Sequence, residues 1–143
     1  GSSDSSSSDD SNATSSVSSF EDEAFNLVND YRASKGLSAL TWNSEIATVA
    51  RGHSLNMSNG SVPFGHDGFD ARGDTLQLSV GWSSIAENVA FNNGFTDASG
   101  TAVNGWIGSS GHEKNMSGNF TKTGMGVAIS SDGSYYFTQI FIR

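Results

Sequence analysis

The side chains of this sequence that could do chemistry are three histidines and one acidic residue in an apolar run. His53, His66 and His112 are the only histidines among 143 residues. Glu87 interrupts the largely apolar stretch 85–91. A carboxylate or an imidazole in apolar surroundings costs free energy unless it has a partner. Such residues are therefore either structural parts or members of a functional site.

His112 is the most informative of these residues. It follows an apolar helical run and a break of small residues over 108–111, which would hold its imidazole at the end of a helix. Two other polar segments, 64–67 and 86–90, are candidates to converge with it. Ser110 lies close to His112, but it is not in a Gly-x-Ser-x-Gly turn and no acid is placed to orient a base. Covalent serine catalysis is therefore not expected.

The composition argues against several classes of partner. The chain has 7 Lys and Arg against 15 Asp and Glu, a net charge of -8 and no basic cluster. We therefore expect no binding to nucleic acid or to an anionic membrane surface. No apolar run approaches the roughly 18 residues of a membrane span. The lack of cysteine excludes disulfides and thiolate metal sites.

The first 19 residues differ in composition from the rest of the chain. They contain eleven serines, three aspartates and almost no apolar side chain. Such a segment cannot offset the entropy lost on ordering, so residues 1–19 are predicted to be a disordered tail or stalk before one domain, 20–143. The polar but weakly charged composition of the domain favours an extracellular or cell-surface location. We expect an exported protein whose signal peptide has been removed, or a lipoprotein anchored through an upstream cysteine.

Hydrophobic periodicity predicts helices in the first two thirds of the chain. A helix is expected over 21–35, with Ser18 and Glu21 at capping-box spacing. A second helix is expected from Asn43 or Ser44 to about residue 58, with His53 on its buried face. Residues 58–82 are predicted to be mostly irregular, and a third helix is expected over 97–107.

The last part of the chain has the pattern of strands. Residues 123–129 alternate between apolar and small or polar side chains, and Asp132-Gly133 predicts a hairpin turn before a buried strand over 135–142. Helices therefore come first and strands last. This order favours a sandwich of helices and a sheet over regular βαβ repeats.

Eight short segments resemble the CAP superfamily of cysteine-rich secretory, antigen 5 and pathogenesis-related proteins. The similarity is to its disulfide-free bacterial branch of SCP-like domains. The matching segments follow the family's order and are 25–32, 36–42, 50–57, 64–66, 87–90, 105–116, 124–128 and 136–141. The resemblance implies an α+β fold, a three-layer α-β-α sandwich with a central, mainly antiparallel, twisted sheet. It also implies a large open cleft lined by histidine and acidic side chains.

The family's cleft typically contains two histidines and two glutamates, and this sequence matches them only in part. The first histidine corresponds to His66 and the first glutamate to Glu87. The second glutamate falls near Ser109 and the second histidine at Tyr136, so both are missing. The resemblance implies that His112 replaces the missing histidine from a different backbone position. Ser109 and Tyr136 are then expected to line the cleft.

Two interpretations of His66, Glu87 and His112 remain open. They are either a hydrogen-bonded polar cluster that orders the cleft loops, or ligands of an open zinc site with a fourth position for water. Some family members bind a divalent metal in the cleft, as the second interpretation requires. His53 is expected to be a satisfied core histidine that supports His66.

The function that this comparison favours is binding without catalysis. We expect an exported, monomeric domain that holds an unknown ligand, whether a small molecule, a lipid or a protein surface, in its cleft. The loss of two family positions argues against turnover. The alternatives are a metal-dependent hydrolase or peptidase that uses His66, Glu87 and His112, and a structural surface domain whose cleft has no role.

Overall fold

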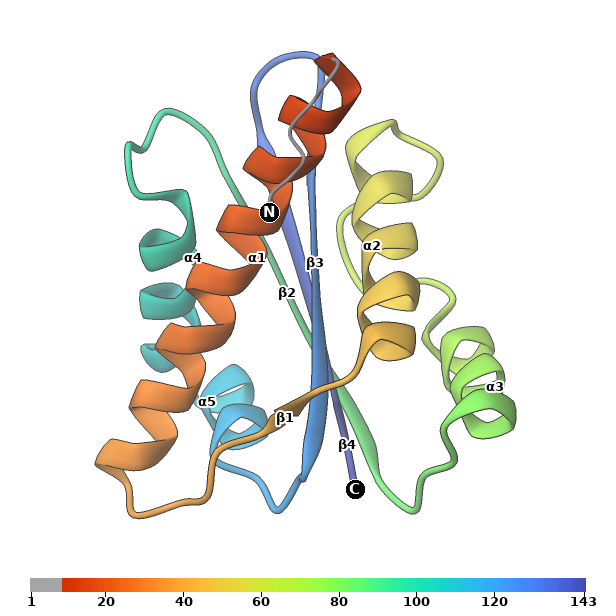
Figure 1. Ribbon diagram of the computed structural model, residues 1–143, viewed down its shortest axis with the longest axis vertical. Helices are drawn as coiled ribbons and strands as arrows, with labels where there is room; N and C mark the ends of the chain where they lie inside the picture. The colour runs from red at the N-terminus through yellow and green to blue at the C-terminus, as the bar shows by residue number, and fades with distance from the viewer. Residues whose placement is uncertain (1–8) are drawn as a thin grey trace.

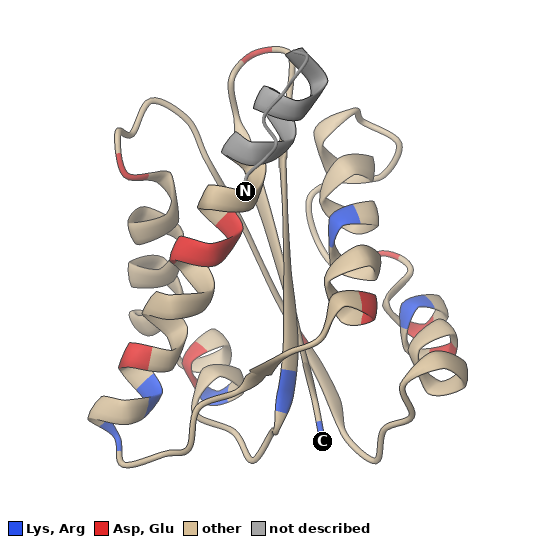
Figure 2. Ribbon diagram, in the orientation of Figure 1, with Lys and Arg blue, Asp and Glu red and all other residues tan. Residues whose placement is uncertain are grey.

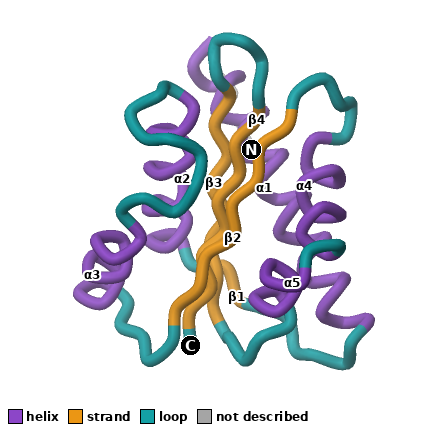
Figure 3. The backbone as a smooth tube through the Cα atoms, turned by 180° about the vertical axis from the view of Figure 1, so that it is seen from behind, coloured by secondary structure: helices purple, strands orange, loops and turns teal. Residues whose placement is uncertain are grey.

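The computed structural model describes the backbone of residues 9–143 and the side chains from residue 17 onward. The elements, in chain order, are α1 (Asp9–Ser34), β1 (Thr41–Trp42), α2 (Ser44–Ser58), α3 (Phe69–Ser79), β2 (Ile85–Asn92), α4 (Ala98–Ile107), α5 (Ser110–Met116), β3 (Lys122–Ile129) and β4 (Tyr135–Ile142). They form three layers (Figure 1). Helices α1, α4 and α5 cover one face of the sheet, and α2 and α3 cover the other, as the view from behind also shows (Figure 3).

The sheet has the strand order β1-β3-β4-β2. β4 pairs antiparallel with both β2 and β3, whereas the short β1 runs parallel to β3. The structure thus confirms the predicted α-β-α sandwich with a mainly antiparallel sheet. β2 is an edge strand, which leaves one side of its backbone free of sheet pairing.

Each face of the sheet has its own hydrophobic core. Because strand side chains alternate between faces, Phe137 and Phe141 of β4 pack with α1 and α4, while Ile140 and Ile142 pack with α2 and α3. All four side chains are at most 1% exposed. The two cores hold the sheet rigidly between the helical layers.

Two glycines of β3 allow α2 to lie directly on the sheet. A Cβ atom at Gly124 would collide with the backbone of Ala47, and one at Gly126 would collide with the backbone of Arg51. This close approach brings the Ser54 hydroxyl to 2.9 Å from the Gly126 carbonyl oxygen, to which it donates. The contact between α2 and β3 therefore fixes the position of the neighbouring His53.

Helix α1 starts earlier than the sequence predicted. It begins at Asp9, not at Glu21, so the segment 9–19 of the expected tail is helical in the structure. Val17 and Phe20 pack against the core, and the Phe20 ring meets Tyr135 with the ring centroids 4.8 Å apart. These apolar contacts account for the turn of α1 from Val17 to Phe20. Residues 1–8 of the expected tail lie outside the described residues.

Helices α2 and α4 agree closely with the second and third helices that the sequence predicted. The Asn43 side chain caps α2 by accepting from the backbone of Glu45 and Ile46, and the Asp97 side chain caps α4 by accepting from Gly100. The prediction of an irregular segment over 58–82 was wrong at α3. That helix buries only Gly73 and Leu76, so its sequence shows no apolar stripe.

Within the described chain, no helix is both long enough and apolar enough to cross a membrane.

Candidate functional site

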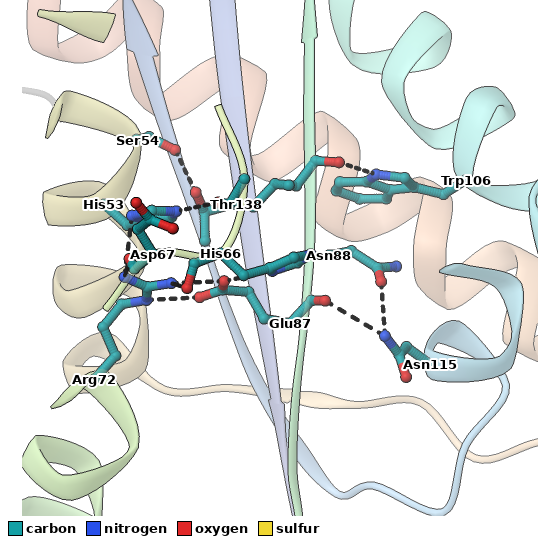
Figure 4. Close-up of polar contacts among 12 residues, drawn as sticks. His53, Ser54, His66, Asp67, Arg72, Glu87, Asn88, Trp106, Asn115 and Thr138 are labelled. Carbon is teal, nitrogen blue, oxygen red and sulfur yellow. Dashed lines mark hydrogen bonds and ion pairs between the residues drawn. The ribbon is translucent and has the colours of Figure 1, made fainter. Parts of the chain in front are cut away.

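The Glu87 carboxylate is the centre of a buried ionic cluster. β2 directs this side chain toward α3, where only 1% of it is exposed. Arg72 donates from Nε to Oε2 and from Nη2 to Oε1, both at 2.7 Å. His66 Nδ1 lies 2.8 Å from Oε1 (Figure 4). Both oxygens of the carboxylate are thus occupied, and its charge is neutralised by a bidentate arginine.

Arg72 also holds the loop that carries His66. Its Nη1 donates to the Asp67 carbonyl oxygen at 2.8 Å, and its Nη2 lies 3.3 Å from the His66 carbonyl oxygen. The side chain is 11% exposed. Sequence analysis missed Arg72 because it lies on α3, in the segment predicted to be irregular, and no motif singled it out.

His53 supports the cluster from α2, as expected of a core histidine. Its Nε2 lies 2.7 Å from the Gly65 carbonyl oxygen, which can only accept, so Nε2 donates. Nδ1 is then the acceptor for Arg72 Nη1 at 3.0 Å. Burial lowers the pKa of His53, and the Arg72 charge lowers it further. The neutral imidazole therefore supports His66 through Arg72 and Gly65 and has no direct bond to it.

His66 is the exposed member of the cluster, with half of its side chain accessible. Because Nδ1 faces the Glu87 carboxylate at 2.8 Å it is the donor, and Nε2 is the ring nitrogen on the exposed side. His66, Glu87, Phe69 and Asn115 are among the residues that line a cavity of about 220 Å³, called the α3 cavity below. The structure thus brings two of the predicted site residues into direct contact.

His112 lies in the short helix α5, which is docked against β2 by two asparagines. Asn88, fully buried in β2, donates to the His112 carbonyl oxygen at 3.1 Å, and Asn115 donates to the Asn88 side-chain oxygen at 2.9 Å. The His112 ring contacts Ser109, with Nδ1 2.9 Å from Oγ. Burial, followed by the charge of His66, lowers the pKa of His112.

His112 and Ser109 line a different cavity from His66 and Glu87. This α4 cavity has a volume of about 270 Å³ and lies between β2, α4 and the loop around Phe64. Tyr136 stacks against Phe91, a lining residue, with ring centroids 5.5 Å apart. Four of the five predicted cleft residues are therefore divided between two cavities beside β2, whereas Tyr136 lines neither and stacks on Phe91.

The geometry does not fit a zinc site built on His66, Glu87 and His112. Glu87 would have to leave Arg72 to bind a metal, because both of its oxygens already accept hydrogen bonds. Among the residues that the structure describes, no group of three or more His, Cys, Asp or Glu side chains is placed to hold a metal ion. Glu87 serves instead to neutralise Arg72 and to orient His66.

Comparison with known proteins identifies the fold and its relatives. The family model for CAP, the cysteine-rich secretory protein family, matches residues 25–141. The chain is 35% identical over 127 residues to the uncharacterized membrane protein YlbC of Bacillus subtilis. That alignment covers 86% of this chain and 34% of the relative, so the chain spans about a third of that protein.

Solved structures agree with this match. An extracellular protein from Bacillus anthracis that contains an SCP domain superposes with a TM-score of 0.73 at 34% identity, covering 88% of this chain and 41% of that one. A cysteine-rich secretory protein from Staphylococcus aureus gives 0.66 at 26% identity, covering 87% and 38%. An outer surface protein from Borrelia burgdorferi, at 16% identity and a TM-score of 0.68, covering 83% and 88%, shares the fold. The chain belongs to the cysteine-rich secretory protein (CAP) family.

Proposed function

We propose that this domain is a non-catalytic binding module that holds its ligand beside β2, across the α3 and α4 cavities. The observation that supports the proposal is the state of Glu87. A general base needs a free lone pair directed at the reacting proton. The Glu87 side chain is 1% exposed and accepts three hydrogen bonds from Arg72 and His66, so the one carboxylate among the described lining residues of the two cavities is buried and paired and does not serve as a free base.

The imidazoles of the site are suited to recognition. His66 offers Nε2 from the exposed side of its ring, and His112 is held neutral beside Ser109. Around them, the cavity walls combine apolar groups such as Phe69 and Trp106 with these few polar atoms. Largely preformed concave sites of this composition are typical of small-molecule binding.

The relatives support a location outside the cell. The Bacillus anthracis structure is described as an extracellular protein, and the Borrelia burgdorferi structure as an outer surface protein. The serine-rich, weakly charged composition of this chain agrees with such a setting. We therefore propose that the domain acts as a monomer at or beyond the cell surface.

A combined binding and turnover experiment tests this function. The imidazole signals of His66 and His112 are followed by NMR while small molecules, lipids and peptides are added, and the same compounds are assayed for hydrolysis with and without zinc. The expected result is a ligand that shifts both imidazoles and is recovered unchanged.

The contact between Ser109 and His112 is the feature of the site that most favours hydrolysis, so the experiment must include a variant at Ser109. Their 2.9 Å separation is that of a nucleophile and its base, although none of the ion pairs of the described residues joins His112 to a carboxylate. Hydrolysis that is lost in Ser109→Ala, or zinc-dependent hydrolysis that is lost in His66→Ala, would overturn the proposal. Glu87→Gln serves as the variant that separates an ionic role of Glu87 from its packing.

A further inference from the structure

A residue that lines the α4 cavity has a buried acceptor without a partner in the described part of the chain. Asn92, at the end of β2, is 9% exposed and lines the cavity. Its Nδ2 donates to the Ala98 carbonyl oxygen at 3.1 Å, which identifies the other amide atom as oxygen. That oxygen has no hydrogen-bond partner among the described residues. A buried acceptor in this state destabilises the protein unless a donor reaches it from the cavity.

One wall of the α4 cavity is aromatic. Phe64 and Phe91 line it and are 46% and 52% exposed, unusually high values for phenylalanine. Their rings meet edge to face with centroids 4.8 Å apart, and Tyr136 stacks behind Phe91. Aromatic faces are electron-rich and attract the slightly positive C–H groups of an apolar surface. This aromatic wall (Phe64, Phe91 and Tyr136) is therefore suited to a flat, C–H-rich face of a ligand.

The rest of the α4 cavity lining is apolar or small, apart from a few uncharged polar groups. Val89, Ala90, Ala102, Gly105 and Trp106 line it together with Thr101, Ser109 and His112, and among the described residues no Lys, Arg, Asp or Glu does. His112 favours its neutral form because burial lowers its pKa. The basic residues are scattered over the molecule (Figure 2), and Lys114, although it is on α5, is not among the lining residues. An anionic or cationic ligand would thus lose its hydration without gaining a counter-ion.

The edge of β2 is not open to an added peptide strand. The Val89 carbonyl oxygen accepts from the Trp106 indole at 3.0 Å, and the Glu87 carbonyl oxygen lies 3.4 Å from Asn115 Nδ2. Both carbonyl groups are therefore occupied by side chains of α4 and α5, which removes the acceptors that β-strand addition would use. A purely apolar chain is also a poor match, because it would leave the Asn92 amide oxygen without a donor.

We propose that the α4 cavity binds a neutral saccharide. A sugar ring combines an apolar C–H face, which would lie on the aromatic wall, with hydroxyl groups that both donate and accept. One hydroxyl would donate to the Asn92 amide oxygen, and others would pair with Thr101 and Ser109. This assignment rests on the proposed binding function, and it names the chemical class of the ligand and the cavity that holds it.

The assignment is tested by titrating the full chain, labelled with ¹⁵N, with neutral oligosaccharides of glucose and of N-acetylglucosamine. Signals of the Asn92 side-chain amide and of the backbone over 89–92 and 101–106 report binding. We expect millimolar or tighter binding that is weakened about five- to tenfold by Phe91→Leu. Phe95→Leu, at an equally exposed phenylalanine outside the cavity lining, leaves the affinity unchanged. Thr101→Val, which keeps the side-chain shape and removes the hydroxyl, also weakens binding.

Three outcomes would overturn the saccharide assignment. They are the absence of shifts at Asn92 with every neutral saccharide, equal affinity in the Phe91 and Phe95 variants, and tighter binding of a sulfated glycan or of fatty-acid vesicles. The imidazole signals separate this failure from that of the proposed function. If another ligand shifts the NMR signals of His66 and His112 while sugars shift none, the proposed binding function is supported and only the saccharide assignment is wrong.

Discussion

At the scale of single residues, the site depends on a cation that pairs with its only buried acid. Arg72 connects α3, β2, the loop 65–67 and His53 through its five donors. A buried carboxylate without such a partner would be costly, and a guanidinium matches it in a fixed bidentate geometry. The position of the exposed His66 therefore depends on Arg72, which does not itself line the α3 cavity.

Removing Arg72 should expose this dependence. Arg72→Met leaves the Glu87 charge buried without a cation, so we expect a loss of about 3–5 kcal/mol in the free energy of unfolding. The double variant Arg72→Met, Glu87→Gln should recover much of that loss, because no unpaired charge remains. Urea unfolding of the two single variants and the double variant measures the coupling. If the losses in unfolding free energy of the two single variants simply add in the double variant, the ion pair of Arg72 and Glu87 does not hold the loop.

His53 should make stability depend on pH. Its pKa in the folded protein is lowered by burial and by Arg72, whereas the unfolded value is about 6.5. The unfolded chain therefore binds the proton more readily, so this contribution is fully present above about pH 6.5 and is lost as the pH falls toward the folded pKa. His53→Gln keeps an acceptor and a donor but cannot titrate. Urea midpoints at pH 7.5 and 5.5 should differ less in this variant than in the parent, and an equal difference would contradict the assignment.

At the scale of elements, the short helix α5 owes its position to neighbours. Seven residues form no stable helix alone, and Asn88 and Asn115 tie this one to β2. Tyr31 of α1 adds a hydrogen bond to Glu113 at 2.7 Å. The docking places His112 beside the α4 cavity, so the helix is the link between the sheet edge and the second imidazole.

Asn88→Ala should release α5 from the sheet. The loss of two buried hydrogen bonds is expected to destabilise the protein by about 1–3 kcal/mol. Amides of residues 110–116 should then exchange with solvent faster than the rest of the chain, and the pKa of His112 should rise toward its ordinary value as its burial is lost. Hydrogen exchange and NMR titration measure both effects. Lys114→Ala, on the exposed side of α5, is the control that should change neither.

The sequence was sufficient for elements with a strong local signal. The starts of α2 and α4 and the turn before β4 were predicted, because Asn43, Asp97 and Asp132-Gly133 act within a few residues. β2, α3 and α5 were not predicted, because their stability comes from contacts distant in sequence. The same limit applies to the candidate site. The predicted cluster of His66, Glu87 and His112 did not include Arg72, and the position of His112 at another cavity depends on those missed elements.

The glycines of β3 allow a second test at this scale. Gly126→Ala places a methyl group against the backbone of Arg51, so α2 must move away from the sheet. We expect a loss of about 1–3 kcal/mol from overpacking and a disturbed contact between His53 and Arg72. Gly52→Ala, in the same helix with open space around it, should instead stabilise the protein by up to about 1 kcal/mol. Thermal unfolding compares the two, and similar effects would refute the role of close packing.

At the scale of the whole molecule, two separate cores share one sheet, and the candidate site lies where the edge strand passes between them. The α3 cavity opens beside the core of α2 and α3, and the α4 cavity beside the core of α1 and α4. A ligand that spans both would contact each helical layer. Neither imidazole is on the sheet, but Glu87 and Asn88 of β2 hold the His66 side chain and the His112 backbone, so the edge strand sets the spacing of the two rings.

The N-terminal boundary of the folded domain lies before residue 20. The sequence placed it at residue 20, but Val17 and Phe20 both pack on the core, and Glu21 accepts from the buried Val127 N–H and from Arg51. A chain that starts at residue 17 should therefore keep the urea midpoint of the full chain. One that starts at residue 22 should lose about 1–3 kcal/mol from the unpaired Val127 donor alone, and more from the lost Phe20 contacts. A lower midpoint on removal of residues 1–16 would show instead that the serine-rich segment stabilises the folded domain.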